Sequence, residues 1–319
     1  MPRRSLLLLL PLLAAVALAA GCGSSSSSSR PGAIDVVVTT TQLGDLVRNV
    51  GGDAVDVHQI LRPNTDPHDY EPRPKDIQAT AGAKLVITSG DELDAWMGDV
   101  IKNAGGSPDT LDASDGAPFT VPGETSGPEA SRFDPHWWHD PRNAEHAVTA
   151  IRDALARANP AKTAEIDANA TKYLNKLDTL DTGIAKCMRS VPAAQRKLVT
   201  DHDAFNYFAK RYGIDVVGAV IPSQTTQAQP SAGDVADLTA TIRREHVKAI
   251  FPESSINSKL ADAIARETGA SSGLTLYGDT LGAAGSAGAT YLSMEAANAD
   301  AMVRGFTGGA QRCRIAGIS

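Results

Sequence analysis

Residues 143–189 read NAEHAVTAIRDALARANPAKTAEIDANATKYLNKLDTLDTGIAKCMR and contain almost no strand signal. The segment is rich in Ala, Lys, Asp and Leu, and Pro160 divides it into two predicted helices, with Asn159 in the N-cap region of the second. The second helix, roughly residues 162–188, would be ~40 Å long at about 1.5 Å per residue. We therefore expect one rigid helix that links two lobes and permits only small movements between them.

Strands alternate with helices on both sides of this segment. Before it, apolar runs predict strands at 34–40, 55–60 and 85–89, with helices at 43–50 and 75–81. After it, strands are predicted at 197–200, 214–220, 249–252 and 274–277, with helices at 204–212, 234–245 and 258–268. Such alternation is typical of parallel sheets. We predict an α/β fold with two (β/α) lobes, each with a mainly parallel four-stranded sheet, at residues 33–160 and 190–319, joined by a linking helix at 161–189.

The composition excludes several classes of protein. Of the 319 residues, 42% are hydrophobic and 21% are charged, which is ordinary for a globular chain and rules out a disordered protein or a coiled-coil rod. The formal net charge of −7, with no basic cluster in the body of the chain, counts against a nucleic-acid partner. Only the N-terminal stretch is apolar enough to enter a bilayer, so a multi-span membrane protein is excluded.

The first 32 residues resemble a bacterial export signal followed by a tether. Arg3 and Arg4 precede an apolar run, and small residues lead up to Cys22, as in a lipoprotein signal. An ordinary secretory signal is the alternative. Residues 22–32 include six consecutive serines, which predict a flexible polar tether. We expect residues 1–21 to be removed, Cys22 to carry lipid, and the protein to work outside the cytoplasm, anchored to the outer face of the cell membrane.

The other two cysteines, Cys187 and Cys313, lie far apart in the sequence. In an oxidising compartment such a pair suggests one disulfide, which would tie the C-terminal tail to the second half of the chain. Two free buried thiols are the alternative. Neither cysteine has a second metal ligand nearby in the sequence, so no zinc role is expected for them.

Three of the seven histidines lie in strongly marked polar contexts. His68 lies in a loop with four prolines among residues 63–74, and these prolines favour a preorganised ligand because they restrict the backbone. His136 lies between a proline and two tryptophans. His202 follows a predicted strand, at the end where parallel α/β folds place ligands, and Asp279 is placed likewise. An exposed turn for His68 and a helix N-cap for Asp279 are the alternatives.

Together, His68, His136, His202 and Asp279 predict a four-ligand site for a divalent transition metal. Nearby aspartates could orient the imidazole N–H groups. The lack of thiolates counts against copper(I) and iron–sulfur chemistry. His139 is the one competitor, because it lies three residues after His136 and could share a helical face with it. The remaining histidines, which we do not expect to be ligands, are His58, His146 and His246.

Five motifs, in order, resemble those of the zinc/manganese solute-binding proteins of bacterial ABC importers. They are Pro67-His68-Asp69-Tyr70-Glu71-Pro72, Asp134-Pro135-His136-x-Trp138, His202-Asp203-Ala204-Phe205-x-Tyr207-Phe208, Pro252-Glu253-Ser254-Ser255 and Asp279-Thr280-Leu281-Gly282. The resemblance covers nearly the whole mature chain. It implies two lobes joined by a long helix, with the metal in the cleft between them and two ligands from each lobe: His68 and His136, then His202 and Asp279.

The resemblance implies a receptor rather than an enzyme. Such a receptor captures Zn²⁺ and delivers it to a membrane permease driven by a cytoplasmic ATPase, and we expect a monomer. Histidine at position 202 favours zinc, whereas many manganese-type members have glutamate there. Two features depart from the family: His139 replaces an aliphatic residue, and the loop at 116–132 lacks the histidines of many zinc members. Import of Mn²⁺ or Fe²⁺ is the main alternative, followed by a zinc hydrolase and a cell-adhesion lipoprotein with a structural metal.

Overall fold

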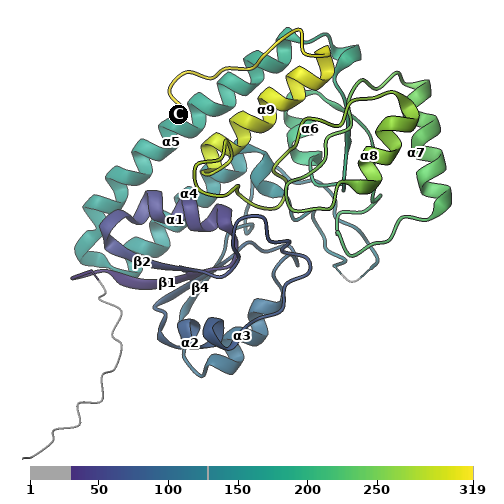
Figure 1. Cartoon of the computed structure of the whole chain (residues 1–319). Coiled ribbons are helices and arrows are strands. Elements are labelled where there is room, and N and C mark those ends of the chain that lie inside the picture. Colours follow the sequence, from purple (N-terminus) through teal and green to yellow (C-terminus); the bar gives the residue numbers. More distant parts are fainter. Residues whose placement is uncertain (1–29, 128, 319) are drawn as a thin grey trace, which may run out of the picture.

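The computed structural model describes residues 30–127 and 129–318. These residues form two α/β lobes joined by the long helix α5 (Thr163–Ser190), which runs beside both lobes in Figure 1. The predicted signal peptide, Cys22 and most of the tether lie outside the described residues. Among the described helices, none is both long and apolar enough to cross a bilayer.

The first lobe is built on a parallel sheet with the strand order β2-β1-β3-β4. Its strands are β1 (Ile34–Val38), β2 (Val55–Gln59), β3 (Leu85–Thr88) and β4 (Asp109–Asp112). Its helical elements are α1 (Thr41–Gly51), η1 (Gly52–Ala54), α2 (Pro74–Gly82), α3 (Trp96–Ala104) and η2 (Trp137–His139). The predicted parallel four-stranded sheet is confirmed. The sequence patterns predict three of its strands, and β4 is the fourth.

The second lobe departs from the predicted four strands. Only β5 (Lys197–Thr200) and β6 (Asp215–Ala219) form a parallel ladder. The segments expected at 249–252 and 274–277 are attached through isolated parallel bridges, Thr200 to Phe251 and Glu253 to Leu276. Pro252 has no N–H to donate, which interrupts a ladder at this point. The helical elements are η4 (Ala193–Gln195), α6 (Asn206–Tyr212), α7 (Ala232–Arg244), α8 (Lys259–Thr268) and α9 (Tyr291–Thr307).

The linking region forms two helices separated at Pro160, as the sequence predicts. These are α4 (Pro141–Ala158) and α5, with the short turn η3 (Pro160–Lys162) between them. The buried side chains of α5 recur at helical spacing, from Ile166 through Tyr173 and Leu177 to Ile184. They belong to one apolar core that extends from strand β1 of the first lobe to Phe251 of the second. This continuous core supports a rigid connection between the lobes.

The C-terminal tail returns along α5 (Figure 1). Cys187 on α5 and Cys313 in the tail are joined by a disulfide in this structure. Gly183 leaves room for the tail, because a Cβ atom there would lie 2.5 Å from Cγ2 of Ile315. The tail is therefore fixed to the linking helix by a covalent bond and by close packing.

Candidate metal centre

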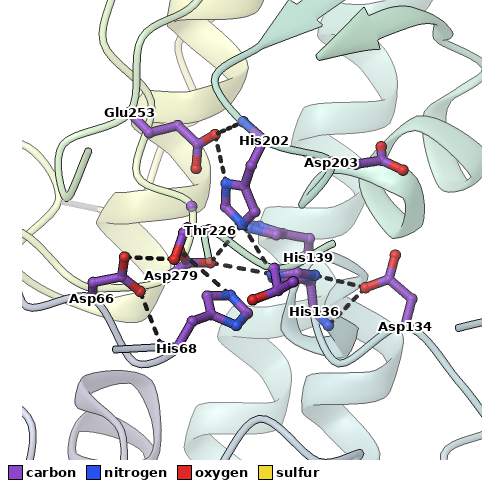
Figure 2. A network of polar contacts seen from close by, with 12 residues as sticks. Asp66, His68, Asp134, His136, His139, His202, Asp203, Thr226, Glu253 and Asp279 are labelled. Atoms are coloured by element: carbon purple, nitrogen blue, oxygen red, sulfur yellow. Dashed lines mark hydrogen bonds and ion pairs between the residues drawn. The ribbon is translucent and has the colours of Figure 1, made fainter. Parts of the chain in front are cut away.

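Four side chains meet between the two lobes: His68, His136, His202 and Asp279 (Figure 2). One ligand-type atom from each lies within 4.8 Å of the other three, and all four side chains are buried. Oδ1 of Asp279 lies 3.2 Å from Nε2 of His136 and 3.4 Å from Nε2 of His202, and Oδ2 lies 3.9 Å from Nε2 of His68. Within the described residues, no other group of His, Cys, Asp or Glu side chains converges in this way.

Each lobe supplies two of these side chains from segments that follow its strands. His68 lies in the proline-rich loop between β2 and α2, and His136 immediately precedes η2. His202 follows β5, and Asp279 follows the bridged segment that pairs through Leu276. The carboxyl ends of parallel strands therefore face one another across the boundary between the lobes, where α/β folds place ligands.

A carboxylate holds the second ring nitrogen of each imidazole. Asp134 accepts from Nδ1 of His136 at 2.7 Å, and Glu253 accepts from Nδ1 of His202 at 2.9 Å. Glu129 accepts from Nδ1 of His68 at 2.5 Å. Because Nδ1 is held by a carboxylate, Nε2 is the ring atom that faces the common point, and its lone pair can bind a metal once any proton on it is displaced, as in carboxylate–histidine–metal arrangements.

Only one of the three carboxylate partners lies next to its histidine in the sequence. Asp134 lies two residues before His136, and such a nearby aspartate is expected from the sequence to orient the imidazole. Glu253 lies in a recognised motif 51 residues from His202, and Glu129 lies 61 residues from His68. No local pattern connects a glutamate to a histidine at such distances, so these two pairs cannot be predicted from the sequence.

Several buried polar atoms at the centre have no hydrogen-bond partner. They are Nε2 of His68 and both carboxylate oxygens of Asp279. Buried polar atoms are normally hydrogen-bonded, because leaving one unpaired costs about 1–3 kcal/mol. Unpaired acceptors that face one another in a buried site are the arrangement expected of metal ligands.

The electrostatics of the metal-free site favour positive charge. Burial alone would lower the pKa of His136, but Asp134 and Asp279 raise it to about 9. Burial opposes protonation of His202 as well, yet Asp279 and Glu253 raise its pKa well above the ordinary value. Burial would raise the pKa of Asp279, but the neighbouring imidazoles, His202 first, hold it well below the usual range. The site therefore attracts protons or a cation.

His139 is not part of this converging group, although it lies three residues after His136 in the sequence. Its Nδ1 lies 2.7 Å from Oε1 of Glu295 on α9, and its ring stacks on Phe205 with 4.3 Å between centroids. Both His139 and Glu295 are fully buried. The competitor for the second ligand position is thus engaged in a separate buried pair.

The family model described as "Zinc-uptake complex component A periplasmic" matches residues 36–305. The zinc-binding protein TroA of Treponema pallidum is 34% identical over 273 residues, which cover 84% of this chain and 87% of TroA. The iron-binding protein YfeA of Yersinia pestis is 32% identical over 271 residues, or 85% of this chain and 86% of YfeA. The manganese-binding lipoprotein MntA of Halalkalibacterium halodurans is 28% identical over 277 residues, or 86% and 89% of the two chains.

The fold is also similar to that of solved relatives. The structure of the periplasmic zinc-binding protein TroA from Treponema pallidum superimposes with a TM-score of 0.79 at 33% sequence identity. The match covers 86% of this chain and 99% of that one. The two-lobe architecture is therefore shared over nearly the whole of the described chain.

Proposed function

This chain belongs to the family of periplasmic zinc-uptake components, which are metal-binding receptors of ABC importers, and we propose that its cargo is Zn²⁺. The convergence of three imidazole Nε2 atoms and one carboxylate on a common buried point supports this proposal. We propose His68, His136, His202 and Asp279 as the four ligands. Each lobe contributes two of them, so binding of the ion would hold the lobes together.

The donor set favours zinc over manganese. Zn²⁺ binds imidazole nitrogen well and takes four ligands, whereas carboxylate and carbonyl oxygens suit Mn²⁺. Affinity at a site rich in nitrogen donors also follows the order Mn²⁺ < Fe²⁺ < Zn²⁺. The relatives are named for zinc, iron and manganese binding, so their names do not select one metal. Import of Mn²⁺, or of Fe²⁺, is the second candidate, and it would place a hard cation among three nitrogen donors.

The charge around the site also suits a divalent cation. Zn²⁺ bound by neutral imidazoles and by ionised Asp279 would leave a local charge of about +1, because the metal brings two positive charges and the carboxylate one negative charge. The carboxylates of Asp134, Glu253 and Glu129, each on an imidazole Nδ1, offset this charge and increase the basicity of the ligands. The buried surroundings keep competing water away from the ion.

We propose transport without chemical conversion of a substrate. Hydrolysis by zinc needs an open coordination position with a base beside it, and four buried protein donors would fill a tetrahedral site. The loaded receptor would dock on a permease in the cytoplasmic membrane, and ATP hydrolysis on the cytoplasmic side would drive release. Lipid on Cys22 would hold the receptor, as a monomer, at the outer face of that membrane.

Competitive titration of the metal-free protein with Zn²⁺ and Mn²⁺ at neutral pH tests this proposal. We expect tighter binding of Zn²⁺, with one ion bound per chain. His136→Ala should lose this binding, whereas His139→Ala should retain it, provided that circular dichroism shows both variants folded. Tighter binding of Mn²⁺ would overturn the zinc assignment. Loss of the fold when a chelator removes the metal would point instead to a structural ion.

A further inference from the structure

Two segments, residues 121–124 and 131–134, run antiparallel beside the candidate metal centre. Their backbones are joined by hydrogen bonds from Gly123 N to Arg132 O at 3.1 Å and from Asp134 N to Val121 O at 2.9 Å. Gly123 permits the close approach, because a Cβ atom there would lie 2.4 Å from a carbonyl oxygen of the opposite segment. We call these two segments, together with Glu129 between them, the acidic arm.

Three carboxylates of the acidic arm have three different partners. Asp134, at its base, holds Nδ1 of His136, and Glu129 holds Nδ1 of His68. Glu124 reaches the second lobe, where it accepts from Oγ of Ser223 at 3.0 Å and from the backbone N of Gln224 at 2.9 Å. One short stretch of chain therefore connects two proposed ligands with the lobe that supplies the other two.

His136 and His202 are each held by a carboxylate of their own lobe. Oδ1 of Asp134 accepts from both the backbone N and Nδ1 of His136, at 3.0 and 2.7 Å. Oε1 of Glu253 accepts from the same two atoms of His202, at 3.0 and 2.9 Å. All four residues are buried. The Nδ1 bonds of these two imidazoles therefore stay within one lobe, although Oδ2 of Asp134 also accepts from Nδ2 of Asn206 in the second lobe at 3.1 Å.

His68 is held differently, through contacts that cross between the lobes. Its backbone oxygen accepts from the side chain of Gln227, which belongs to the second lobe. Its backbone N donates to Asp66, and Asp66 in turn accepts from Oγ1 of Thr226 at 2.7 Å (Figure 2). Its ring is held by Glu129 of the acidic arm. The position of His68 thus depends on the contact that residues 223–227 make with the first lobe.

We propose that Glu124 and Glu129 are positioning residues that make retention of the metal depend on contact between the lobes. Glu124 ties the acidic arm to the second lobe, together with the bonds from Nε2 of Gln224 to Pro122 O and from Nδ2 of Asn206 to Asp134. The arm held in this way keeps His68 in the orientation of a ligand through Glu129. When the contact at residues 223–224 is lost, the arm is released, Glu129 leaves His68, and one of four ligands is lost while three remain. The inference rests on the proposed function, and it concerns the rate of release.

Stopped-flow measurements of zinc uptake and of zinc release to a chelator test the inference. We expect Glu124→Ala and Glu129→Ala to release zinc about tenfold faster, as the loss of a charge-assisted hydrogen bond predicts, with association rates within about twofold of wild type. Glu129→Gln should fall between wild type and Glu129→Ala, since its amide oxygen still accepts from Nδ1. The exposed neighbours provide matched controls, Glu71→Gln and Thr125→Val, which should release zinc at the wild-type rate.

Two further measurements separate positioning from a merely structural role. The thermal unfolding midpoint of the metal-free protein should fall only slightly in Glu124→Ala, because the side chain is partly exposed and other bonds between the arm and the second lobe remain. Since both glutamates act through one arm, the double variant should release zinc no faster than the faster single variant. Two results would overturn the inference and leave the proposed function standing. One is release at the wild-type rate from both single variants, and the other is a loss of metal-free stability as large as the change in the release rate. Absence of zinc binding by wild type would instead overturn the proposed function.

Discussion

The indole nitrogen of Trp138 donates a hydrogen bond to the carbonyl oxygen of Gly278 at 3.1 Å, across the boundary between the lobes. Trp138 lies two residues after His136, and Gly278 immediately precedes Asp279. The Trp138 ring also lies 5.4 Å from the imidazole of His136, centroid to centroid. This single bond therefore connects two proposed ligand segments of different lobes, and it fixes the distance between their backbones.

Trp138→Phe should weaken zinc binding while keeping the buried aromatic ring. The variant loses the N–H donor together with the five-membered ring of the indole, and the matched control loses the same atoms. A typical hydrogen bond contributes about 0.5–1.5 kcal/mol, so we expect roughly a two- to tenfold loss of affinity beyond that of the control. Trp137→Phe is the matched control, because its indole donates to Ser89 O within the first lobe at 2.9 Å. That control should lose stability without losing affinity. Equal losses of affinity by calorimetry in both variants would contradict this role for Trp138.

Gly278→Ala should weaken zinc binding through Glu253 and His202. A Cβ atom at Gly278 would lie 2.0 Å from Oε2 of Glu253, so the carboxylate has to move away from the imidazole that it holds. We expect a loss of affinity of about tenfold or more, since outer partners of ligating histidines typically contribute 10–100-fold. Gly98→Ala, on α3 with no atom within 4 Å of the added Cβ, should bind like wild type. Wild-type zinc affinity in Gly278→Ala would show that the added Cβ atom does not disturb binding through Glu253 and His202.

The four candidate ligands could be found from the sequence because each is marked locally, by prolines, tryptophans or the end of a strand. Their supporting groups could not. Glu129 and Glu253 reach their histidines from 61 and 51 residues away, and only the packed fold brings them together. The same is true of Glu295, which holds His139 from another helix and so removes it from competition with His136.

The fold was predictable where one pattern extends over many residues, as in α5. Short elements were harder to predict. Strand β4 has the sequence DTLD, and its partly exposed residues reflect an edge position, so no apolar run marks it. In the second lobe, the apolar runs at 249–252 and 274–277 predict full strands, whereas the structure has only isolated bridges there. Apolar character shows that a segment is buried, and hydrogen bonding decides whether it is a strand.

Replacing both Cys187 and Cys313 by serine should lower stability without changing zinc affinity. The disulfide closes a loop with a sequence separation of 126 residues, and such cross-links typically contribute about 2–4 kcal/mol, mainly by restricting the unfolded chain. The tail packs on α5, with Ile315 next to Gly183, and no hydrogen bond joins its described residues to a proposed ligand. Denaturant unfolding and zinc titration of wild type, the double variant and reduced wild type provide the measurements. A fall in affinity that accompanies the loss of stability would show that the tail acts on the site.

His139→Ala should destabilise the fold by about 3–5 kcal/mol at neutral pH, because it leaves Glu295 buried without its partner. Burial already raises the pKa of Glu295, although His139 opposes the rise, and the variant should raise it further. A carboxyl group whose pKa is raised in the folded state destabilises the fold increasingly as pH increases. The loss of stability caused by His139→Ala should therefore become smaller toward acid pH. Denaturant unfolding at two pH values measures this, and His139→Leu combined with Glu295→Met should restore stability. A deficit independent of pH would exclude an unpaired Glu295 as its cause.

Zinc binding should release protons. The pKa of His136 is raised to about 9 and that of His202 well above its ordinary value. Both imidazoles of the metal-free protein therefore favour the positively charged form, with a proton on each ring nitrogen, at pH 7. Zinc needs neutral imidazoles, so we expect about two protons to be released per ion, one from each histidine. Calorimetry in buffers of different ionisation enthalpy counts them. Asp134→Asn removes a group that raises the pKa of His136, and it should reduce the count toward one.

The same pKa shifts predict opposite pH dependences for zinc affinity and for the stability of the metal-free protein. Below both raised pKa values, displacement of two protons increases the apparent zinc affinity by up to about 100-fold per pH unit. The metal-free fold, in contrast, is stabilised by protonated His136. That contribution is complete below the ordinary histidine pKa of about 6.5 and is lost as pH rises through about 9. With a chelator present, the midpoint temperature of thermal unfolding should therefore decrease as the pH is raised from 6.5 to 9. The midpoint temperature of zinc-saturated protein should not show this decrease. A metal-free midpoint that rises over this range would show that the carboxylates around His136 do not hold its proton.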